Sequence, residues 1–169
     1  MSSKAMVHKY GNHVDTDTIL PGHYLDLSTA EELAPHCMKG LDTDFVARVR
    51  SGDVIVGGKN FGTGSSREHA PISIKGNGVS CVVAISYARI FYRNAINIGL
   101  PVFECPELVA EVKHGDAIDV DVLRGEFFLN GVLYKAKPFA ATVQNIIQAG
   151  GLAPFVRQRI QQADPSPAG

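Results

Sequence analysis

A chain of 169 residues, 45% hydrophobic and 20% charged, suits one packed domain and is too apolar to stay disordered. The formal net charge of −1 argues against a nucleic-acid or anionic-membrane partner, and no apolar stretch approaches the length of a membrane span. The three cysteines are odd in number and widely spaced, which supports neither a disulfide framework nor a metal or iron–sulfur site within this chain. With no signal peptide evident, we expect a reduced, cytoplasmic protein.

The first segment of interest is Val14-Asp15-Thr16-Asp17-Thr18, which places two carboxylates and two hydroxyls within five residues. The Asp-x-Asp spacing resembles the start of a calcium loop, but the later ligands of such a loop are missing. Spacing alone therefore favours turns capped by the Asp and Thr side chains.

Two short helices are predicted next. Ser28 would cap the first, with Glu31 three residues further on, and Gly40 would end it. Asp42 would cap the second, which would extend to Val49.

A glycine-rich loop then follows the short β-branched run 53–56, which predicts a buried strand. The loop reads Gly57-Gly58-Lys59-Asn60-Phe61-Gly62-Thr63-Gly64-Ser65-Ser66-Arg67-Glu68-His69-Ala70, and residues 67–75 are predicted to be helical. Glycines let a ligand approach the backbone, and the first turn of a helix attracts anions through its free N–H groups. Because the Arg67 guanidinium suits a carboxylate or phosphate, the loop predicts an anion site.

The same residues allow a purely structural interpretation. Ser65 to Glu68 match a capping box, with Ser65 as the cap and Glu68 bonding back to it. Alternatively, Ser66 caps the helix and Ser65 faces outward, so spacing leaves both roles open. Three known loops are excluded: a P-loop needs a Lys that is missing here, a dinucleotide fingerprint needs Gly where Arg67 stands, and a nucleophile elbow needs Gly two residues after its serine.

The remaining pattern predicts an α/β fold. A second apolar strand at 79–85 and a helix at 87–96 continue the order strand, helix, strand, helix, which implies a parallel βαβ crossover. This arrangement puts the glycine-rich loop at the carboxyl end of a strand, where open α/β sheets keep their sites.

The last third changes in character. A short strand at 100–103 and a helix at 106–113 precede alternating apolar and polar residues, and the Asn130-Gly131 turn indicates a hairpin, so residues 117–136 predict an antiparallel β meander. Further helices are expected within 138–148 and 152–160. We expect one domain over residues 1–163 and a disordered tail at 164–169.

Three segments together resemble one known family. Residues 58–70 are similar to the signature of the aconitase superfamily's mobile swivel domain, and Val14–Pro21 and Tyr87–Asn94 match further parts of that pattern in the same order. The resemblance extends from Val7 to Val156. A separate chain of this length resembles the small subunits of the two-subunit members, the 3-isopropylmalate dehydratases and their relatives. It implies a swivelling β/β/α domain, with a parallel βαβ core and an added antiparallel β meander.

The resemblance also implies a function. The expected activity is that of a [4Fe–4S]-dependent hydro-lyase, most closely the isomerisation of 2- and 3-isopropylmalate by dehydration and rehydration in leucine biosynthesis. The cluster is expected in a large partner subunit, within a heterodimer or heterotetramer. This chain would supply Ser65 as the proton-accepting base and Arg67 as the clamp for a substrate carboxylate, with Ser66 and Asp17 also binding the small dicarboxylic hydroxy acid.

A further implied feature concerns substrate choice. In two-subunit relatives, the residues after the pair Tyr24-Leu25 form a loop that contacts the variable group of the substrate, so Tyr24, Leu25, Asp26 and Leu27 are expected to bind it. Homoaconitase-like members resemble Tyr-Leu-Arg-Thr there. Asp26 stands in place of that Arg and would repel a third substrate carboxylate, which favours an alkyl-substituted malate.

Alternatives remain open at this point. Asp26 could simply face solvent or cap the following helix. The substrate could be 2,3-dimethylmalate, citramalate or homoaconitate, and the chain could also be a non-catalytic module that binds an anion or a partner.

Overall fold

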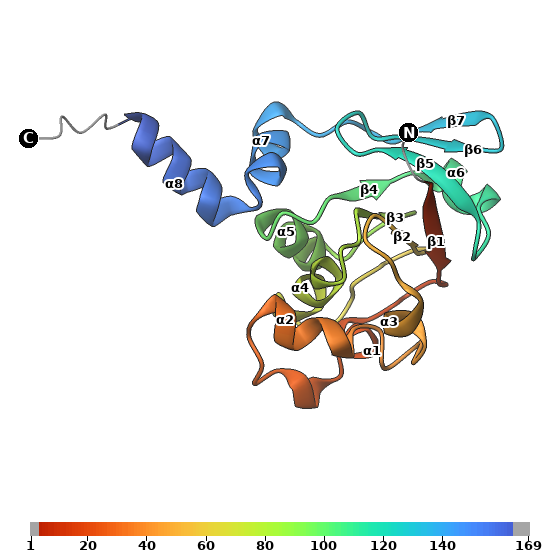
Figure 1. Cartoon of the computed structure of the whole chain (residues 1–169), viewed down its shortest axis with the longest axis horizontal. Helices are drawn as coiled ribbons and strands as arrows, with labels where there is room; N and C mark the ends of the chain where they lie inside the picture. Colours follow the sequence, from red (N-terminus) through yellow and green to blue (C-terminus); the bar gives the residue numbers. More distant parts are fainter. Residues whose placement is uncertain (1–3, 164–169) are drawn as a thin grey trace, which may run out of the picture.

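A curled sheet of seven strands forms the centre of the computed structural model, which describes residues 4–163 (Figure 1). The order of the strands across the sheet is β4-β3-β2-β1-β5-β6-β7. The strands are β1 (Ala5–Lys9), β2 (Val54–Val56), β3 (Cys81–Ala84), β4 (Val102–Glu104), β5 (Ala117–Asp121), β6 (Glu126–Leu129) and β7 (Val132–Lys135). The tail predicted at 164–169 lies outside the described residues.

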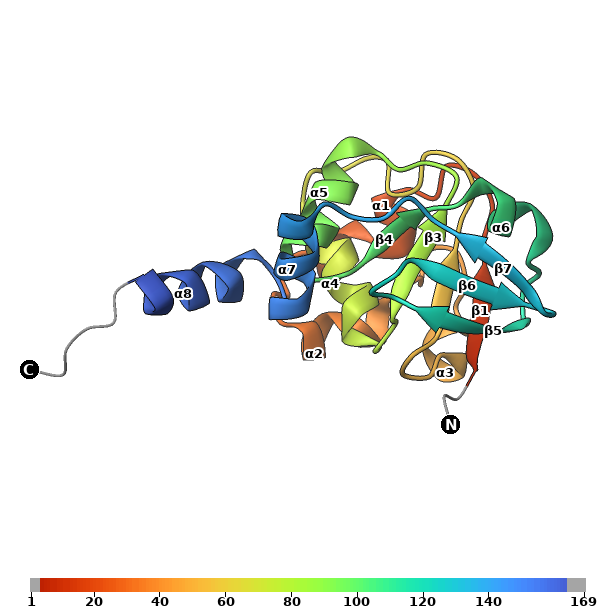
Figure 2. The same ribbon diagram turned by 90° about the horizontal axis from the view of Figure 1, so that it is seen from above.

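The helices mostly connect these strands. The α-helices are α1 (Thr16–Ile19), α2 (Ala30–Leu33), α3 (Phe45–Arg48), α4 (His69–Gly76), α5 (Arg89–Asn97), α6 (Pro106–Glu111), α7 (Ala141–Ala149) and α8 (Leu152–Ala163). Two short 3₁₀ helices are η1 (Gly22–Tyr24) and η2 (Ala34–His36). Figures 1 and 2 show α8 projecting away from the rest of the chain. Within residues 4–163, no helix combines the length and the apolar character that crossing a membrane requires.

The predicted fold class is confirmed. Strands β1, β2, β3 and β4 pair in parallel, with α4 between β2 and β3 and α5 between β3 and β4. Strands β5, β6 and β7 form the antiparallel meander, which joins the parallel half where β5 pairs with β1. The glycine-rich loop accordingly leaves the carboxyl end of β2, as the strand order predicts.

Alternate residues of the central strands supply two cores. Ile55 and Val82 pack on the side of α4 and α5, with Phe61 and Phe91. Val54 and Val83 face the other side, where α6 and the meander cover them. Each central strand is buried on both faces, which explains why these strands are continuous apolar runs rather than alternating ones.

Two predicted helix starts are wrong, the first by one residue and the second by two. The N-cap of α2 is Thr29 rather than Ser28, because the Thr29 hydroxyl accepts from the N–H of Glu32 at 3.2 Å. The helix α3 begins at Phe45, whereas the Asp42 carboxylate is occupied by the Tyr10 hydroxyl at 2.8 Å and by an ion pair with Arg48. Asp42 therefore ties α3 to the end of β1 instead of capping the helix.

A buried polar network holds β1, β2 and α3 together. His8 is fully buried, with Nε2 at 2.9 Å from Asp53 Oδ2, and Arg48 Nε donates to His8 Nδ1 at 3.3 Å. Since Nδ1 accepts that bond, the proton lies on Nε2 and the ring is neutral. Burial lowers the pKa of His8, and this effect together with the nearby Arg48 charge exceeds the opposing influence of Asp53.

This network predicts how stability depends on pH. Below about pH 6.5 the unfolded chain binds a proton at residue 8 that the folded chain resists, so the free energy of unfolding should fall as the pH drops from about 7 to 5. Urea unfolding across this range should show a smaller pH slope in His8→Asn than in wild type. His13→Asn, at an exposed position, should keep the wild-type slope. Equal slopes for His8→Asn and wild type would contradict the neutral buried histidine.

Candidate active site

Two segments far apart in the sequence lie side by side at the carboxyl end of β2. The N–H of Gly62 donates to the carbonyl of Val14 at 2.7 Å, and the N–H of Thr16 donates to the carbonyl of Thr63 at 2.8 Å. The N–H of Ser65 then donates to the Thr16 hydroxyl at 2.9 Å. The turn predicted around Asp15 exists, because Asp15 Oδ1 accepts from the N–H of Thr18 at 2.7 Å.

The third motif segment lies against the same loop. The N–H of Phe61 donates to the carbonyl of Ser86, and the N–H of Ala88 donates to the carbonyl of Phe61, both at 3.0 Å. From α5, the Asn94 amide Nδ2 donates to the carbonyl of Ser66 at 2.8 Å. The motifs at Val14–Pro21 and Tyr87–Asn94 thus both contact the glycine-rich loop, which is the remaining motif.

Two glycines let the loop pass this closely over its neighbours. Gly62 has φ of +84°, and an added Cβ would lie 2.1 Å from the Phe91 ring. Gly64 has φ of +113°, and an added Cβ would lie 3.0 Å from the Thr16 hydroxyl. Both positions require a residue without a side chain.

The predicted capping box is wrong, and so is the helix start at residue 67. The helix α4 begins at His69, with Glu68 as an N-cap whose side chain accepts no capping hydrogen bond. The Ser65 hydroxyl instead accepts from the N–H of Arg67 at 3.1 Å. Ser65, Ser66 and Arg67 therefore form an exposed turn in front of the helix rather than its first turn.

This turn borders a small pocket of about 40 Å³. Four residues predicted for the site from the sequence meet there: Ser65, Arg67, Asp17 and Leu25. Thr16, Leu20, Gly22, His69 and Ala70 complete the lining. Asp17 is exposed, and its Oδ1 accepts from the N–H of Gly22 at 2.9 Å.

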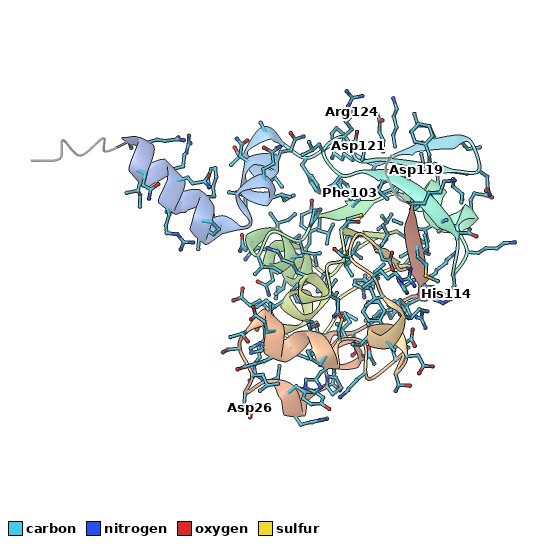
Figure 3. The ribbon with its side chains drawn as sticks, in the orientation of Figure 1. Asp26, Phe103, His114, Asp119, Asp121 and Arg124 are labelled. Carbon is cyan, nitrogen blue, oxygen red and sulfur yellow. The ribbon has the colours of Figure 1, made fainter. Side chains whose placement is uncertain are left out.

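The other predicted site residues lie outside the lining of this pocket. Ser66 is exposed beside it, held through its backbone carbonyl. Tyr24 stacks on His36, with ring centroids 3.9 Å apart. Asp26 is exposed and Leu27 half-buried. Figure 3 shows Asp26 at the outer end of the segment between α1 and α2, far from the labelled residues of the meander.

Some residues of the pocket were missed by the sequence analysis. Thr16 was interpreted only as part of a capped turn, and His69 had no assigned role. His69 Nδ1 is buried and has no hydrogen-bond partner among the described residues. No spacing pattern marks either residue, because the partner of the Thr16 hydroxyl and the other residues that line the pocket come from distant segments of the chain.

Arg67 gives the pocket a guanidinium, which lies in the same lining as the Asp17 carboxylate. The salt bridges of residues 4–163 are His8–Asp53, Arg48–Asp42 and Arg124–Asp121, so the exposed Arg67 guanidinium is not engaged by a carboxylate there. A planar guanidinium presents two parallel N–H groups to a carboxylate. Arg67 is therefore suited to bind a carboxylate from outside the chain.

The donor set of this chain does not suit a metal cluster. Residues 4–163 contain no group of three or more His, Cys, Asp or Glu side chains arranged to hold a metal ion. Cys37, Cys81 and Cys105 are free and buried, and burial raises the pKa of both Cys37 and Cys81 to about 12. Such thiols stay protonated, whereas iron–sulfur clusters are held by thiolates.

Comparison with known proteins agrees with this geometry. Residues 29–107 match the family model of the aconitase C-terminal domain, so fold and loop define an aconitase-type α/β domain. The 3-isopropylmalate dehydratase small subunits of Caldicellulosiruptor bescii and Heliobacterium modesticaldum are each 53% identical over 164 residues, which cover 96% of this chain and 99% of the relative. The solved structure of 3-isopropylmalate dehydratase (LeuD) from Methanocaldococcus jannaschii superposes with a TM-score of 0.91 at 42% identity, covering 99% of this chain and 100% of the other.

The chain belongs to the family of 3-isopropylmalate dehydratase small subunits. The resemblance noticed in three sequence motifs is thereby confirmed, as is the predicted class of activity, a hydro-lyase subunit.

Proposed function

We propose that this chain works with a large subunit to interconvert 2- and 3-isopropylmalate by dehydration and rehydration, a step of leucine biosynthesis. The observation that supports this most is the shared pocket of Ser65, Arg67 and Asp17, found in a chain whose relatives carry the dehydratase name. The pocket is small and open, so it would form one wall of a site that the large subunit completes. The assembly with the large subunit would be a heterodimer or a heterotetramer.

Ser65 is the proposed base. Dehydrating a malate-type acid requires removal of a proton from the carbon beside a carboxylate, and a free serine is far too weak for this. The N–H of Arg67 donates to Ser65 Oγ, and a donor aimed at this oxygen favours its negative form. The Arg67 charge, which lines the same pocket, acts in the same direction.

Arg67 is also the proposed clamp for a substrate carboxylate. Its exposed guanidinium can form two parallel hydrogen bonds with one carboxylate group. Asp17 and Ser66 are the proposed polar contacts for the rest of the hydroxy acid. In this arrangement the carboxylate is held while charge builds on the neighbouring carbon.

We locate the [4Fe–4S] cluster in the large subunit, because the buried cysteines of this chain do not suit it. When bound there, the cluster would supply a Lewis acid for the substrate hydroxyl, as the resemblance to the aconitase superfamily implies. Buried free cysteines also accord with a cytoplasmic location. We further propose that the described chain moves as one swivel domain against the large subunit.

We propose that the loop from Tyr24 to Leu27 contacts the side group of the substrate. Leu25 lines the pocket, and its apolar side chain suits an isopropyl group. Tyr24, Asp26 and Leu27 lie next to it on a partly exposed segment that a closing partner would bring to the substrate. A carboxylate at Asp26 would disfavour substrates with a third carboxylate.

Replacing Asp26 by Arg tests whether this residue selects against a third substrate carboxylate. We expect Asp26→Arg to gain measurable turnover of homoaconitate, with a loss of about tenfold in kcat/KM for 3-isopropylmalate, about 1.4 kcal/mol in transition-state binding. Asp44→Arg, an equal charge change at another exposed position, should alter neither value. If both variants keep the wild-type preference, Asp26 does not face the substrate.

The substrate itself is tested with the assembled wild-type enzyme. Initial rates should be compared for 3-isopropylmalate, 2,3-dimethylmalate, citramalate and homoaconitate. We expect the highest kcat/KM for 3-isopropylmalate. If kcat/KM is higher for one of the other three acids, that acid is the preferred substrate. If none of the four acids is converted, the chain is better described as a non-catalytic module.

A further inference from the structure

The turn formed by Ser65, Ser66 and Arg67 needs support from outside itself. It lies before the first residue of α4, so helical hydrogen bonds do not fix it, and all three residues are exposed. Its own bond is the one from the N–H of Arg67 to Ser65 Oγ. The direction in which this oxygen points therefore depends on what holds the backbone on either side.

Thr16 holds the first side. It is 6% exposed, and its hydroxyl accepts the N–H of Ser65 at 2.9 Å. Its own backbone N–H is bonded to the carbonyl of Thr63, and Asp15 caps the helix that it begins. Thr16 is thus a fixed acceptor, which sets the orientation of the peptide unit that enters Ser65.

Asn94 holds the second side. Its amide Nδ2 donates to the carbonyl of Ser66 at 2.8 Å. That carbonyl and the N–H of Arg67 belong to one planar peptide unit, so fixing one fixes the other. Asn94, the Ser66–Arg67 peptide and Ser65 Oγ therefore form a continuous chain of hydrogen bonds, in which each bond polarises the next.

Asn94 itself is well anchored. It belongs to α5, whose residues Phe91 and Ala95 are buried in the core beside the loop. Phe91 is also the ring over which Gly62 passes. Because α5 and the loop pack against each other through Phe91, the core holds the donor from Asn94 beside the turn.

We propose that Thr16 and Asn94 are positioning residues for Ser65: Thr16 fixes the entering peptide, and Asn94 orients and polarises the peptide whose N–H stabilises the negative form of the Ser65 hydroxyl. This inference rests on the proposed role of Ser65 as base. In this proposal the motifs that contain Thr16 and Asn94 hold the glycine-rich loop that carries Ser65.

Thr16→Val and Asn94→Ala test the proposal in the enzyme assembled with its large subunit. Each should lower kcat by about 10- to 100-fold and leave KM within about threefold, because misplacing a reacting group costs rate more than binding. Thr16→Ser, which keeps the hydroxyl, should restore kcat to within about threefold of wild type. Melting temperature and co-elution with the large subunit establish that each variant is folded and assembled.

Matched controls are available within the chain. The Thr29 hydroxyl accepts from the N–H of Glu32 in α2, and the Asn77 amide donates to the carbonyls of Ala34 and Ser73, so neither side chain bonds to the loop. Thr29→Val and Asn77→Ala remove comparable bonds, and should lower the melting temperature without changing kcat of the assembled enzyme. An equal loss of kcat in these controls would make the effect of Thr16 and Asn94 merely structural and overturn the proposal.

The deciding measurement is a double-mutant cycle with Ser65→Ala. If Thr16 and Asn94 act through Ser65, adding Thr16→Val or Asn94→Ala to Ser65→Ala should cause no further loss of kcat. A full additional loss would overturn the positioning role, as would single variants that keep wild-type kcat while Ser65→Ala does not. If Ser65→Ala itself keeps wild-type kcat, the proposed function of Ser65 fails, and the cycle separates the two failures.

Discussion

Ser65→Ala should lower kcat of the assembled enzyme by about 10²- to 10⁴-fold, the contribution that a well-placed proton acceptor makes. The substitution removes one exposed oxygen, and Ala keeps the backbone N–H that bonds to Thr16. Folding and assembly should therefore be unchanged. Steady-state rates with 3-isopropylmalate, measured at equal amounts of assembled complex, give the comparison.

A matched serine gives the control for this variant. Ser51 is exposed in the connection from α3 to β2 and does not line the pocket. Ser51→Ala should keep wild-type kcat. If Ser65→Ala is equally active in a fully assembled enzyme, Ser65 is not the base.

Arg67→Lys should raise KM by about 10- to 100-fold with a smaller change in kcat. The ammonium of lysine keeps the charge but cannot form two parallel bonds to one carboxylate, and a charge-assisted hydrogen bond contributes about 1.5–3 kcal/mol. Because the Arg67 backbone is unchanged, the N–H that donates to Ser65 Oγ remains. The two functions of this residue can thus be separated by one substitution.

The control is Arg50→Lys, at an exposed position that does not line the pocket. It should leave both kinetic constants at their wild-type values. A wild-type KM in Arg67→Lys would remove the carboxylate clamp from the proposed mechanism, whereas a large loss of kcat at constant KM would assign Arg67 to the transition state instead.

Local sequence signals were sufficient for the order of the strands from β2 to β7, but they did not predict β1 (Ala5–Lys9), which lies in the middle of the sheet. The β-branched run before the glycine-rich loop predicted β2, and the Asn130-Gly131 turn predicted the hairpin of β6 and β7. These signals depend on neighbours along the chain. The two cores follow from the same apolar runs, since a strand buried on both sides needs apolar residues at every position.

The start of α4 could not be predicted this way. Ser65 to Glu68 have the letters of a capping box, but the N–H of Ser65 is bonded to Thr16, 49 residues earlier, and the carbonyl of Ser66 to Asn94, 28 residues later. These tertiary bonds hold the chain in a turn until His69. A local pattern contains no information on partners so distant.

The candidate site was predicted in part for the same reason. Ser65, Arg67, Asp17 and Leu25 were named from motifs and meet at one pocket. Thr16 and Asn94 stood inside recognised motifs without a role, because their partners are backbone atoms of a loop that only the fold brings near. The roles assigned to all of the predicted site residues, Asp26 and Ser66 included, stay predictions until variants are measured.

The central claim is that this chain is one half of an active site whose cluster-bearing half belongs to another polypeptide. It is tested most directly by assaying each purified subunit alone and then an equimolar mixture under anaerobic conditions with 3-isopropylmalate. The account predicts no detectable conversion by either chain alone and conversion at a rate that rises to a plateau as the complex forms. Conversion by this chain alone at the rate of the mixture would contradict it.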